Sequence, residues 1–255
     1  MTARRVLVTG ASRGIGRAVA EALLARGDHV ALVARDRAAL DSVACAAGGC
    51  AYVVAADLAD PDAVDRVVAR SVEALGGLDD LVSAAGIVRY QRADALRRAD
   101  VEAQLAVNFT APLVLSLRAA EAMRGGGAIV HVASTLAFAP ATATIAYAAS
   151  KAALVAATRG LALELAPRVR VNAVAPGVVD TDMIRVPRLL PGEREPVGDQ
   201  RAWRVAQELE TLRRLHPLER LGTAADIAQA VVYLLDAAWV TGTVLVVDGG
   251  LTLAG

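Results

Sequence analysis

Tyr147 and Lys151 are the residues whose types and spacing most directly indicate chemistry. Lys151 is the only lysine among 27 basic residues, and it lies four residues after Tyr147 in an Ala/Leu-rich stretch that predicts a helix running toward Pro167. Residues i and i+4 share one face of a helix. A phenol has an ordinary pKa near 10, and a neighbouring ammonium stabilises its anion and lowers that pKa. The pair is therefore predicted to be an acid/base centre.

A glycine-rich turn near the N-terminus predicts a nucleotide site. The segment Gly10-Ala11-Ser12-Arg13-Gly14-Ile15-Gly16 follows the first apolar run and precedes an amphipathic stretch. In such a turn the first glycine permits the tight bend, the second lets the backbone approach a pyrophosphate, and the third lets helix and strand pack closely. The helix N-terminus then favours the phosphate charge.

The residues that follow the second apolar run bear on the choice between NAD and NADP. An acidic side chain in that place binds the adenosine ribose of NAD, but here the place is taken by Ala34, followed by Arg35. Arg35 and Arg13 offer two guanidinium groups suited to a 2′-phosphate. NADP is therefore predicted over NAD, and Asp36 lies one residue too far along for the ribose role unless the register differs.

The elements that must position these residues alternate along the chain. Seven short apolar runs predict strands, and the longer segments between them have helical spacing; the runs are residues 6–9, 30–33, 52–55, 81–83, 129–133, 171–174 and 244–247. Because the runs are almost continuously apolar, each strand is expected to be buried on both faces. The pattern predicts one α/β domain over residues 1–255, a doubly wound parallel sheet of seven strands with helices on both faces.

One long segment interrupts this alternation. Residues 182–220 carry several prolines and many charges of both signs, and Trp203 could give the segment an apolar face. Long insertions in compact domains are usually functional or disordered. We expect a lid over the substrate, with a passive surface excursion as the alternative.

Composition argues against other classes of protein. The formal net charge is zero, so neither nucleic acid nor an anionic membrane is expected as a partner. The histidines and the cysteines Cys45 and Cys50 form no metal signature, and reduced thiols in a cytoplasmic protein are expected. No signal peptide is apparent, and the uncharged stretch 125–150 contains three glycines and a proline, which argues against a membrane span.

Together these motifs resemble the classical short-chain dehydrogenase/reductases over nearly the whole chain. The resemblance continues through further matches: Asp57 with Leu58, Ser83-Ala84-Ala85-Gly86, Asn108, Ser134 placed thirteen residues before Tyr147, Asn172-Ala173-Val174-Ala175-Pro176-Gly177, and Val247-Asp248-Gly249-Gly250. It implies a Rossmann fold, a nicotinamide cofactor and a homotetramer or homodimer. Ser83 and Ala84 replace the family's usual asparagines, so side-chain amide contacts are absent there.

The resemblance also implies roles for individual residues. Ser134 would bond the substrate oxygen, Tyr147 would exchange its proton, Lys151 would hold the nicotinamide ribose, and Asn108 would hold a water that relays protons to Lys151. The implied cofactor-binding residues are Gly10, Ser12, Arg13, Gly14, Ile15, Gly16, Arg35, Asp57, Leu58, Ala84, Ala85, Gly86, Tyr147, Lys151, Pro176, Gly177, Val179 and Thr181. The expected substrate pocket comprises Ser134, Leu136, Phe138, Tyr147, Met183 and Trp203.

Three functions remain open at the level of sequence. Residues 220–228 resemble the NADPH-dependent 3-oxoacyl-carrier-protein reductases, which favours a β-ketoacyl or polyketide-type ketone, either small or bound to an acidic carrier that Arg124 and Arg168 would receive. Residues 85–89 and 180–183 are similar to the NAD-dependent dehydrogenases of 2,3-dihydro-2,3-dihydroxybenzoate. The third alternative is a non-catalytic NADP-binding regulator, which the complete set of catalytic residue types disfavours.

Overall fold

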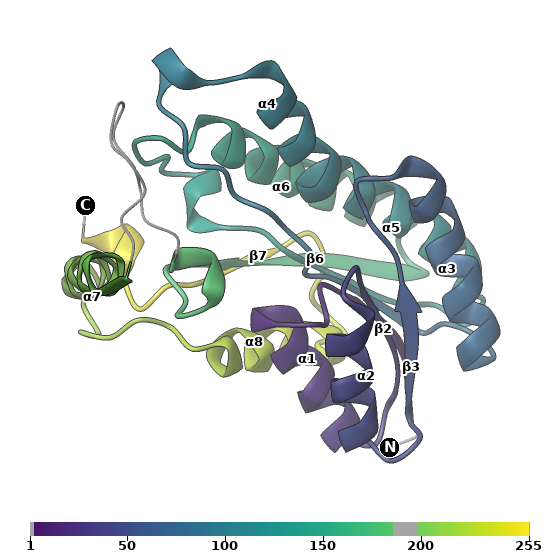
Figure 1. Ribbon diagram of the computed structural model, residues 1–255. Helices are drawn as coiled ribbons and strands as arrows, with labels where there is room; N and C mark the ends of the chain where they lie inside the picture. The colour runs from purple at the N-terminus through teal and green to yellow at the C-terminus, as the bar shows by residue number, and fades with distance from the viewer. Residues whose placement is uncertain (1–2, 186–197, 255) are drawn as a thin grey trace.

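The protein is built around a single parallel sheet. A computed structural model describes residues 3–185 and 198–254. Its seven strands lie in the order β3-β2-β1-β4-β5-β6-β7, and every neighbouring pair is parallel (Figure 1). The strands are β1 (Arg5–Thr9), β2 (His29–Ala34), β3 (Ala51–Ala55), β4 (Asp80–Ser83), β5 (Gly127–Val132), β6 (Val169–Pro176) and β7 (Val244–Val247). The predicted seven strands and doubly wound architecture are confirmed.

Helices cover both faces of the sheet. One face is covered by α1 (Gly14–Ala25), α2 (Arg37–Ala46) and α8 (Ala224–Asp236), and the other by α3 (Pro61–Leu75), α5 (Ala111–Ala122) and α6 (Ile145–Leu165) (Figure 1). The remaining helical elements are α4 (Arg98–Leu105), α7 (Gly198–Arg214), the π-turn η2 (Ala106–Thr110) and the 3-10 turns η1 (Ala93–Ala95), η3 (Thr135–Ala137), η4 (Asp182–Ile184) and η5 (Leu251–Leu253).

Burial explains the apolar runs from which the strands were predicted. Val6, Leu7 and Val8 of β1 are all fully buried, because alternate side chains enter the two separate cores on opposite faces of the sheet. Local signals set the helix ends. In α3, for example, Pro61 occupies the first turn, the Asp60 carboxylate accepts a hydrogen bond from the Asp62 N–H, and Gly76 ends the helix with a φ of 71°.

The strand order reverses between β1 and β4, which lie side by side although two strands separate them in sequence. In doubly wound sheets, ligands bind at the carboxyl ends of the strands beside such a switch point. The glycine turn follows β1, Ser134 follows β5 and the 176–181 segment follows β6, so all three lie at this edge.

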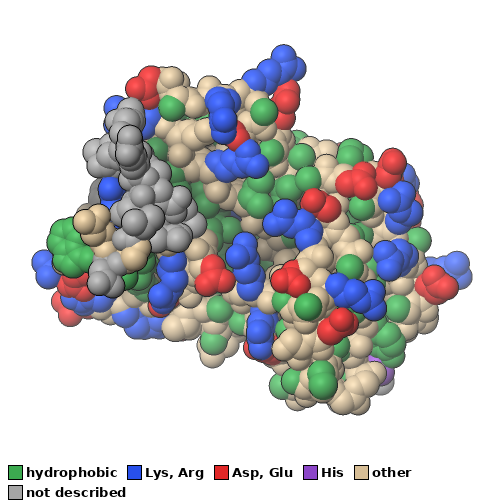
Figure 2. Space-filling view, in the orientation of Figure 1, with side chains coloured by type: hydrophobic (Ala, Val, Ile, Leu, Met, Phe, Trp, Pro, Cys, Tyr) green, Lys and Arg blue, Asp and Glu red, His purple; other side chains and the backbone are tan. Residues whose placement is uncertain are grey.

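Only part of the expected lid can be compared with the structure. Residues 186–197 lie outside the described residues, whereas η4 and α7 fall within the expected range 182–220. None of the helices in the described ranges is long and apolar enough to cross a membrane. On the face drawn in Figure 2, basic and acidic side chains are interspersed, in keeping with the zero net charge.

Candidate active site

Three segments far apart in sequence converge at the carboxyl edge of the sheet. Tyr147 and Lys151 lie in the first two turns of α6, and Ser134 lies two residues after the end of β5. Asn108 lies in the π-turn η2 that joins α4 to α5. π-turns interrupt the regular helical hydrogen-bond ladder and are frequent at functional sites. The four residues predicted to be catalytic are therefore brought together in one region.

Lys151 is held in place by the sheet beneath it. Its ammonium donates a 2.7 Å hydrogen bond to the Val132 carbonyl at the end of β5, and its Nζ lies 5.8 Å from the centre of the Tyr147 ring. The side chain is almost fully buried, and this desolvation lowers the Lys151 pKa to about 8. At neutral pH the group remains mostly an ammonium.

Tyr147 departs from the electrostatic expectation. Its pKa was expected to fall because of Lys151, but burial raises it to about 12. A hydrogen bond with Ser134 acts in the opposite direction, and the nearby phenol of Tyr90 adds to the rise. The expectation of a lowered pKa was therefore wrong, because desolvation of the phenolate outweighs the favourable contacts.

Ser134 is set by a local turn. Its backbone is extended, and its hydroxyl accepts the Leu136 N–H at 3.2 Å, capping the short turn η3. The same hydroxyl also bonds Tyr147. Ser134 thus caps the turn after β5 while its hydroxyl lies against the phenol.

Asn108 joins three parts of the site through one fully buried carboxamide. The carboxamide accepts the Ile87 N–H at 2.8 Å, and its nitrogen donates to the Ile87 carbonyl at 2.9 Å and to the Ser150 hydroxyl at 3.0 Å. Ser150 in turn donates to the Tyr147 carbonyl at 2.7 Å. Asn108 therefore links the segment after β4 to the first turn of the catalytic helix, and its predicted water-relay role remains a prediction.

The glycine turn has the close approaches that its sequence predicted. Gly10 has a φ of 70°, and a Cβ there would lie 2.9 Å from the backbone of Ala85. A Cβ on Gly16 would lie 2.3 Å from the Gly10 carbonyl oxygen. Gly14 has a φ of 55° and faces the Thr181 side chain across a gap that a Cβ would fill at 3.4 Å. The turn can therefore accommodate no side chain at Gly10 or Gly16 without displacement of the backbone.

The start of α1 fits an anionic ligand. Its N-cap residue Arg13 makes no side-chain capping bond, and the first turn contains no acidic residue. The first N–H groups of a helix lack partners within the helix and carry a partial positive charge, which favours phosphate. Ile15 lies in this first turn, and Ser12 directly precedes the N-cap.

The residues predicted to bind the adenosine end of the cofactor lie at the ends of β2 and β3. Ala34 ends β2, and Arg35 is exposed, as is Arg13, which lies 3.9 Å from Asp182 in an exposed ion pair. Asp36 uses one carboxylate oxygen to cap α2 by accepting the Ala39 N–H at 3.0 Å. The expected register at Ala34 is thus supported.

Two further predicted cofactor positions form a turn after β3. The Asp57 carboxylate accepts the Ala59 N–H at 3.0 Å, and Leu58 is buried in the core.

Thr9 is a site residue that the sequence reasoning missed. Its buried hydroxyl accepts two backbone hydrogen bonds, from the N–H groups of Ala84 and Ala85, both at 3.1 Å. These bonds hold the segment 83–86 beside the glycine turn. The sequence could have indicated this role, because Thr9 places a hydroxyl at the end of the first strand, directly before Gly10.

The segment after β6 carries the residues expected to position the nicotinamide. Pro176 ends β6, and a Cβ on Gly177 would lie 2.8 Å from Asp248. Val179 is buried and forms a parallel bridge with Gly222, while Thr181 begins the turn η4. The segment is thereby packed against residues that follow α7.

The other predicted substrate residues lie in or beside η3, η4 and α7. Leu136 and Met183 are partly buried, whereas Phe138 is 48% exposed and Trp203, on α7, is 67% exposed. Their contact with a substrate remains a prediction.

The described residues contain no metal centre. Within residues 3–185 and 198–254, no three His, Cys, Asp or Glu side chains are grouped so that they could hold a metal ion. Cys45 and Cys50 are free thiols.

Comparison with known proteins identifies the family. Residues 4–188 match the model of the short chain dehydrogenase family. The 3-oxoacyl-[acyl-carrier-protein] reductase of Bos taurus is 36% identical, with 96% of this chain and 97% of that protein covered. The 2,3-dihydro-2,3-dihydroxybenzoate dehydrogenase of Bacillus subtilis is 37% identical, with 96% and 95% covered.

A solved structure agrees with these relatives. The ligand-free aldohexose dehydrogenase of Thermoplasma acidophilum superposes with a TM-score of 0.85 at 30% identity, covering 98% of this chain and 94% of that one. With the family model, the relatives and the parallel sheet in agreement, the chain belongs to the short-chain dehydrogenase/reductases and is an NAD(P)-dependent oxidoreductase.

Proposed function

We propose that this protein is an NADPH-dependent ketoreductase that converts a β-ketoacyl or polyketide-type ketone to a secondary alcohol, with Tyr147 as proton donor. The observation that carries the proposal is the grouping of Ser134, Tyr147 and Lys151 at the carboxyl edge of the sheet, with Asn108 bonded to Ser150 of the same helix.

Tyr147 carries the proton that a ketone reduction needs. A proton donor must carry its proton before reaction, and a phenol with a pKa of about 12 does so at neutral pH. In the oxidative direction the same phenol would first have to lose that proton. Ser134 would bond the ketone oxygen, and the Lys151 ammonium would stabilise the anion left on Tyr147.

The choice of NADPH rests on charges around the adenosine end. Ala34 leaves no carboxylate at the end of β2, and the exposed Arg35 and Arg13 can approach a 2′-phosphate. Asp36 is used as a helix cap. When bound, the cofactor supplies the hydride, while the chain's own residues bind it, orient the ketone and supply the proton.

A small or freely diffusing thioester is favoured over a carrier-bound substrate. Arg168 would have to be available to an acidic carrier, but its guanidinium donates to the Ala120 and Met123 carbonyls, the latter at 2.8 Å. Arg124 and Arg168 also precede β5 and β6, which places them toward the amino edge of the sheet, opposite Tyr147.

A cyclic dihydrodiol dehydrogenase is the second candidate function, favoured by the 37% identity with the Bacillus subtilis 2,3-dihydro-2,3-dihydroxybenzoate dehydrogenase. It requires NAD and oxidation. The third class, a non-catalytic regulator, is disfavoured because Ser134 and Lys151 both lie beside Tyr147.

The reaction itself is tested by replacing Tyr147 with Phe. We expect NADPH oxidation with a β-ketoester such as ethyl acetoacetate to fall at least about a hundredfold, because the ring remains but its transferable proton is lost. The dissociation constant of NADPH, followed by fluorescence, should change less than about threefold. Turnover at the wild-type rate would contradict the proposed proton donor.

Cofactor choice is tested by comparing NADPH with NADH. We expect the wild type to bind NADPH more tightly, and Arg35→Ala to weaken NADPH binding about tenfold while leaving NADH binding unchanged, since a charge-assisted bond to the phosphate is lost. Arg37→Ala is the matched control, because Arg37 is exposed and lies 3.7 Å from Asp41 on the same helix. A strong preference of the wild type for NAD would favour the dihydrodiol alternative.

A further inference from the structure

His216 connects the end of α7 to the segment that follows β6. The residue lies two positions after the last residue of α7, and its side chain is only 2% exposed although the surrounding segment lies near the surface. A buried imidazole is normally bonded at both nitrogens. Both nitrogens of His216 have backbone partners.

The two partners fix the tautomer of the ring. Nδ1 lies 2.8 Å from the Leu212 carbonyl oxygen, and because a carbonyl can only accept, Nδ1 carries the hydrogen. Nε2 lies 3.4 Å from the Val178 backbone nitrogen, whose N–H it accepts. One neutral tautomer satisfies both contacts, so the ring joins α7 to Val178 without competing donors.

Backbone bonds continue the same contact toward Thr181. The Gly222 N–H donates to the Val178 carbonyl at 2.9 Å, and the Asp180 N–H donates to the Gly222 carbonyl at 2.8 Å. At the other end, the Leu218 N–H donates to the Gly249 carbonyl at 3.2 Å. The residues after α7 therefore run along the segment 176–181 and are bonded to it. His216 is the first of them to contact this segment through its side chain.

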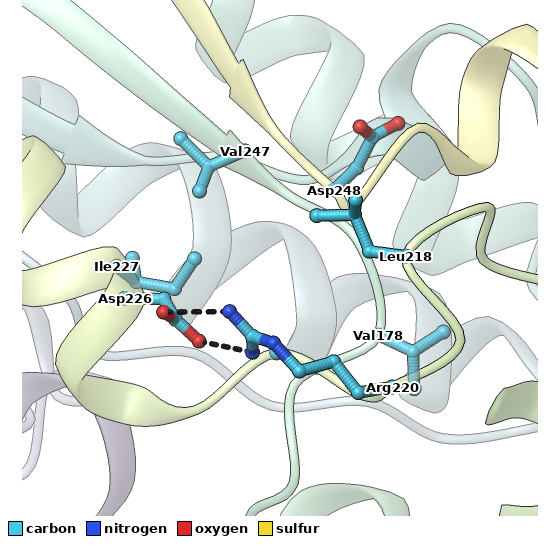
Figure 3. Close-up of a pocket in the computed structure, with 9 residues that line it drawn as sticks. Val178, Leu218, Arg220, Asp226, Ile227, Val247 and Asp248 are labelled. Carbon is cyan, nitrogen blue, oxygen red and sulfur yellow. Dashed lines mark hydrogen bonds and ion pairs between the residues drawn. The ribbon is translucent and has the colours of Figure 1, made fainter.

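The segment 176–181 is not tightly packed on the side that faces α8. A cavity of about 110 Å³ lies between Val178, Leu218, Ile227 and Val247. Figure 3 shows these side chains around the space, with the Arg220–Asp226 ion pair drawn as dashed lines at its edge. Val178 has empty space beside it, so its backbone bonds to His216 and Gly222 contribute more to its position than packing does on this side.

We propose that His216 is a positioning residue for the nicotinamide, acting by holding the Val178 backbone and so coupling the 176–181 segment to α7. The inference rests on the proposed role of Pro176, Gly177, Val179 and Thr181 in binding the nicotinamide. His216 itself touches neither the cofactor nor the substrate in this scheme. Its effect passes through the backbone of the segment.

Two amide substitutions separate the two bonds. The amide of Gln reaches about as far as Nε2, so His216→Gln can accept the Val178 N–H, whereas the shorter amide of Asn reaches only as far as Nδ1 and keeps the Leu212 bond. We expect His216→Asn to weaken NADPH binding about tenfold and to lower kcat more than it changes KM for the ketone, which is the effect of about one hydrogen bond. His216→Gln should stay within about threefold of the wild type. His29→Asn, in the amino-terminal half of the sheet, is the control and should leave both quantities unchanged.

Hydrogen exchange provides a readout that needs no cofactor. Amides of residues 176–181 should exchange about tenfold faster in His216→Asn than in the wild type, and the Gln variant should restore protection. Equal behaviour of the Asn and Gln variants, or wild-type exchange in His216→Asn, would overturn the inference. Failure of the wild type to bind NADPH would instead refute the proposed function, and the exchange comparison would still decide the role of His216.

Discussion

Acidification from pH 7 to pH 5 acts on two fully buried titratable groups in opposite directions. His131 lies on β5 and Asp80 at the start of β4, and both are 0% exposed. Burial lowers the pKa of His131 to about 3 and raises the pKa of Asp80 to about 7. Both shifts disfavour the charged form, but one group is a base and the other an acid, so their contributions to stability change with opposite sign.

The His131 contribution falls as pH falls. Folding keeps the imidazole neutral, whereas in the unfolded chain it takes up a proton below its ordinary pKa of about 6.5. The unfolded state therefore binds more protons between pH 7 and pH 5, and linkage makes this worth about 2 kcal/mol of lost stability. The Lys151 ammonium, close by on α6, contributes to the lowered His131 pKa after burial.

The Asp80 contribution rises over the same interval. Its Oδ1 accepts bonds from Arg4 and from the Ala128 N–H, at 2.9 Å for the latter, whereas its buried Oδ2 has no partner. With a folded pKa of about 7 and an ordinary value of 3.8, the folded state binds the extra proton as pH falls from 7 to 5. This adds about 2 kcal/mol of stability. Because the two contributions cancel, the free energy of unfolding of the wild type should be nearly the same at pH 5 and pH 7.

Single substitutions separate the two effects. A neutral His131 donates to one flanking hydroxyl and accepts from the other. In His131→Leu both hydroxyls still have a backbone acceptor within reach, since the Ser116 Oγ lies 2.7 Å from the Pro112 carbonyl oxygen and the Thr158 Oγ1 lies 2.8 Å from the Leu154 carbonyl oxygen. Urea unfolding followed by circular dichroism should give this variant about 2 kcal/mol more stability at pH 5 than at pH 7. Asp80→Asn should instead be about 2 kcal/mol less stable at pH 5 than at pH 7. The stability of the double variant should not change between the two pH values. A His131→Leu profile as flat as that of the wild type would refute the assignment of a neutral buried imidazole.

Two further substitutions test the geometry of the site. Lys151→Arg should lower kcat by about a hundredfold, because a planar guanidinium cannot replace a buried ammonium that lies within a few ångströms of Gly86; near-normal kcat in the ketoester assay would contradict this. Gly16→Ala should abolish NADPH binding, since its Cβ would meet the Gly10 carbonyl at 2.3 Å. Gly160→Ala, which has no neighbour within 4 Å, should instead stabilise α6 by about 0.5–1 kcal/mol in thermal unfolding. Equal effects of the two glycine substitutions would show that the turn tolerates a side chain.

The sheet was predictable because its cause is local in sequence. Each run such as residues 30–33 is apolar without interruption, and burial on both faces is what such a run requires. The glycine turn was predictable for a related reason. Positive φ and close backbone contact leave few residue types other than glycine, so glycines at positions 10 and 16 indicate a tight turn from the sequence alone.

The electrostatics of the site were not predictable, because they depend on the surroundings of each group. The spacing of Tyr147 and Lys151 placed both on one helix but gave no measure of the desolvation that raises the Tyr147 pKa. The contacts of Asn108 with Ile87 and Ser150, and those of Thr9 with Ala84, span 21 to 75 residues and follow only from the assembled sheet.

The raised Tyr147 pKa changes what Lys151 must do. The ammonium lies 5.8 Å from the ring centre and donates a 2.7 Å bond to the Val132 carbonyl. Burial therefore keeps Tyr147 protonated at rest, and the ammonium can stabilise the phenolate only as the proton leaves. Because a raised pKa makes the phenol a weaker acid, this stabilisation of the developing phenolate is what allows Tyr147 to act as the proposed proton donor.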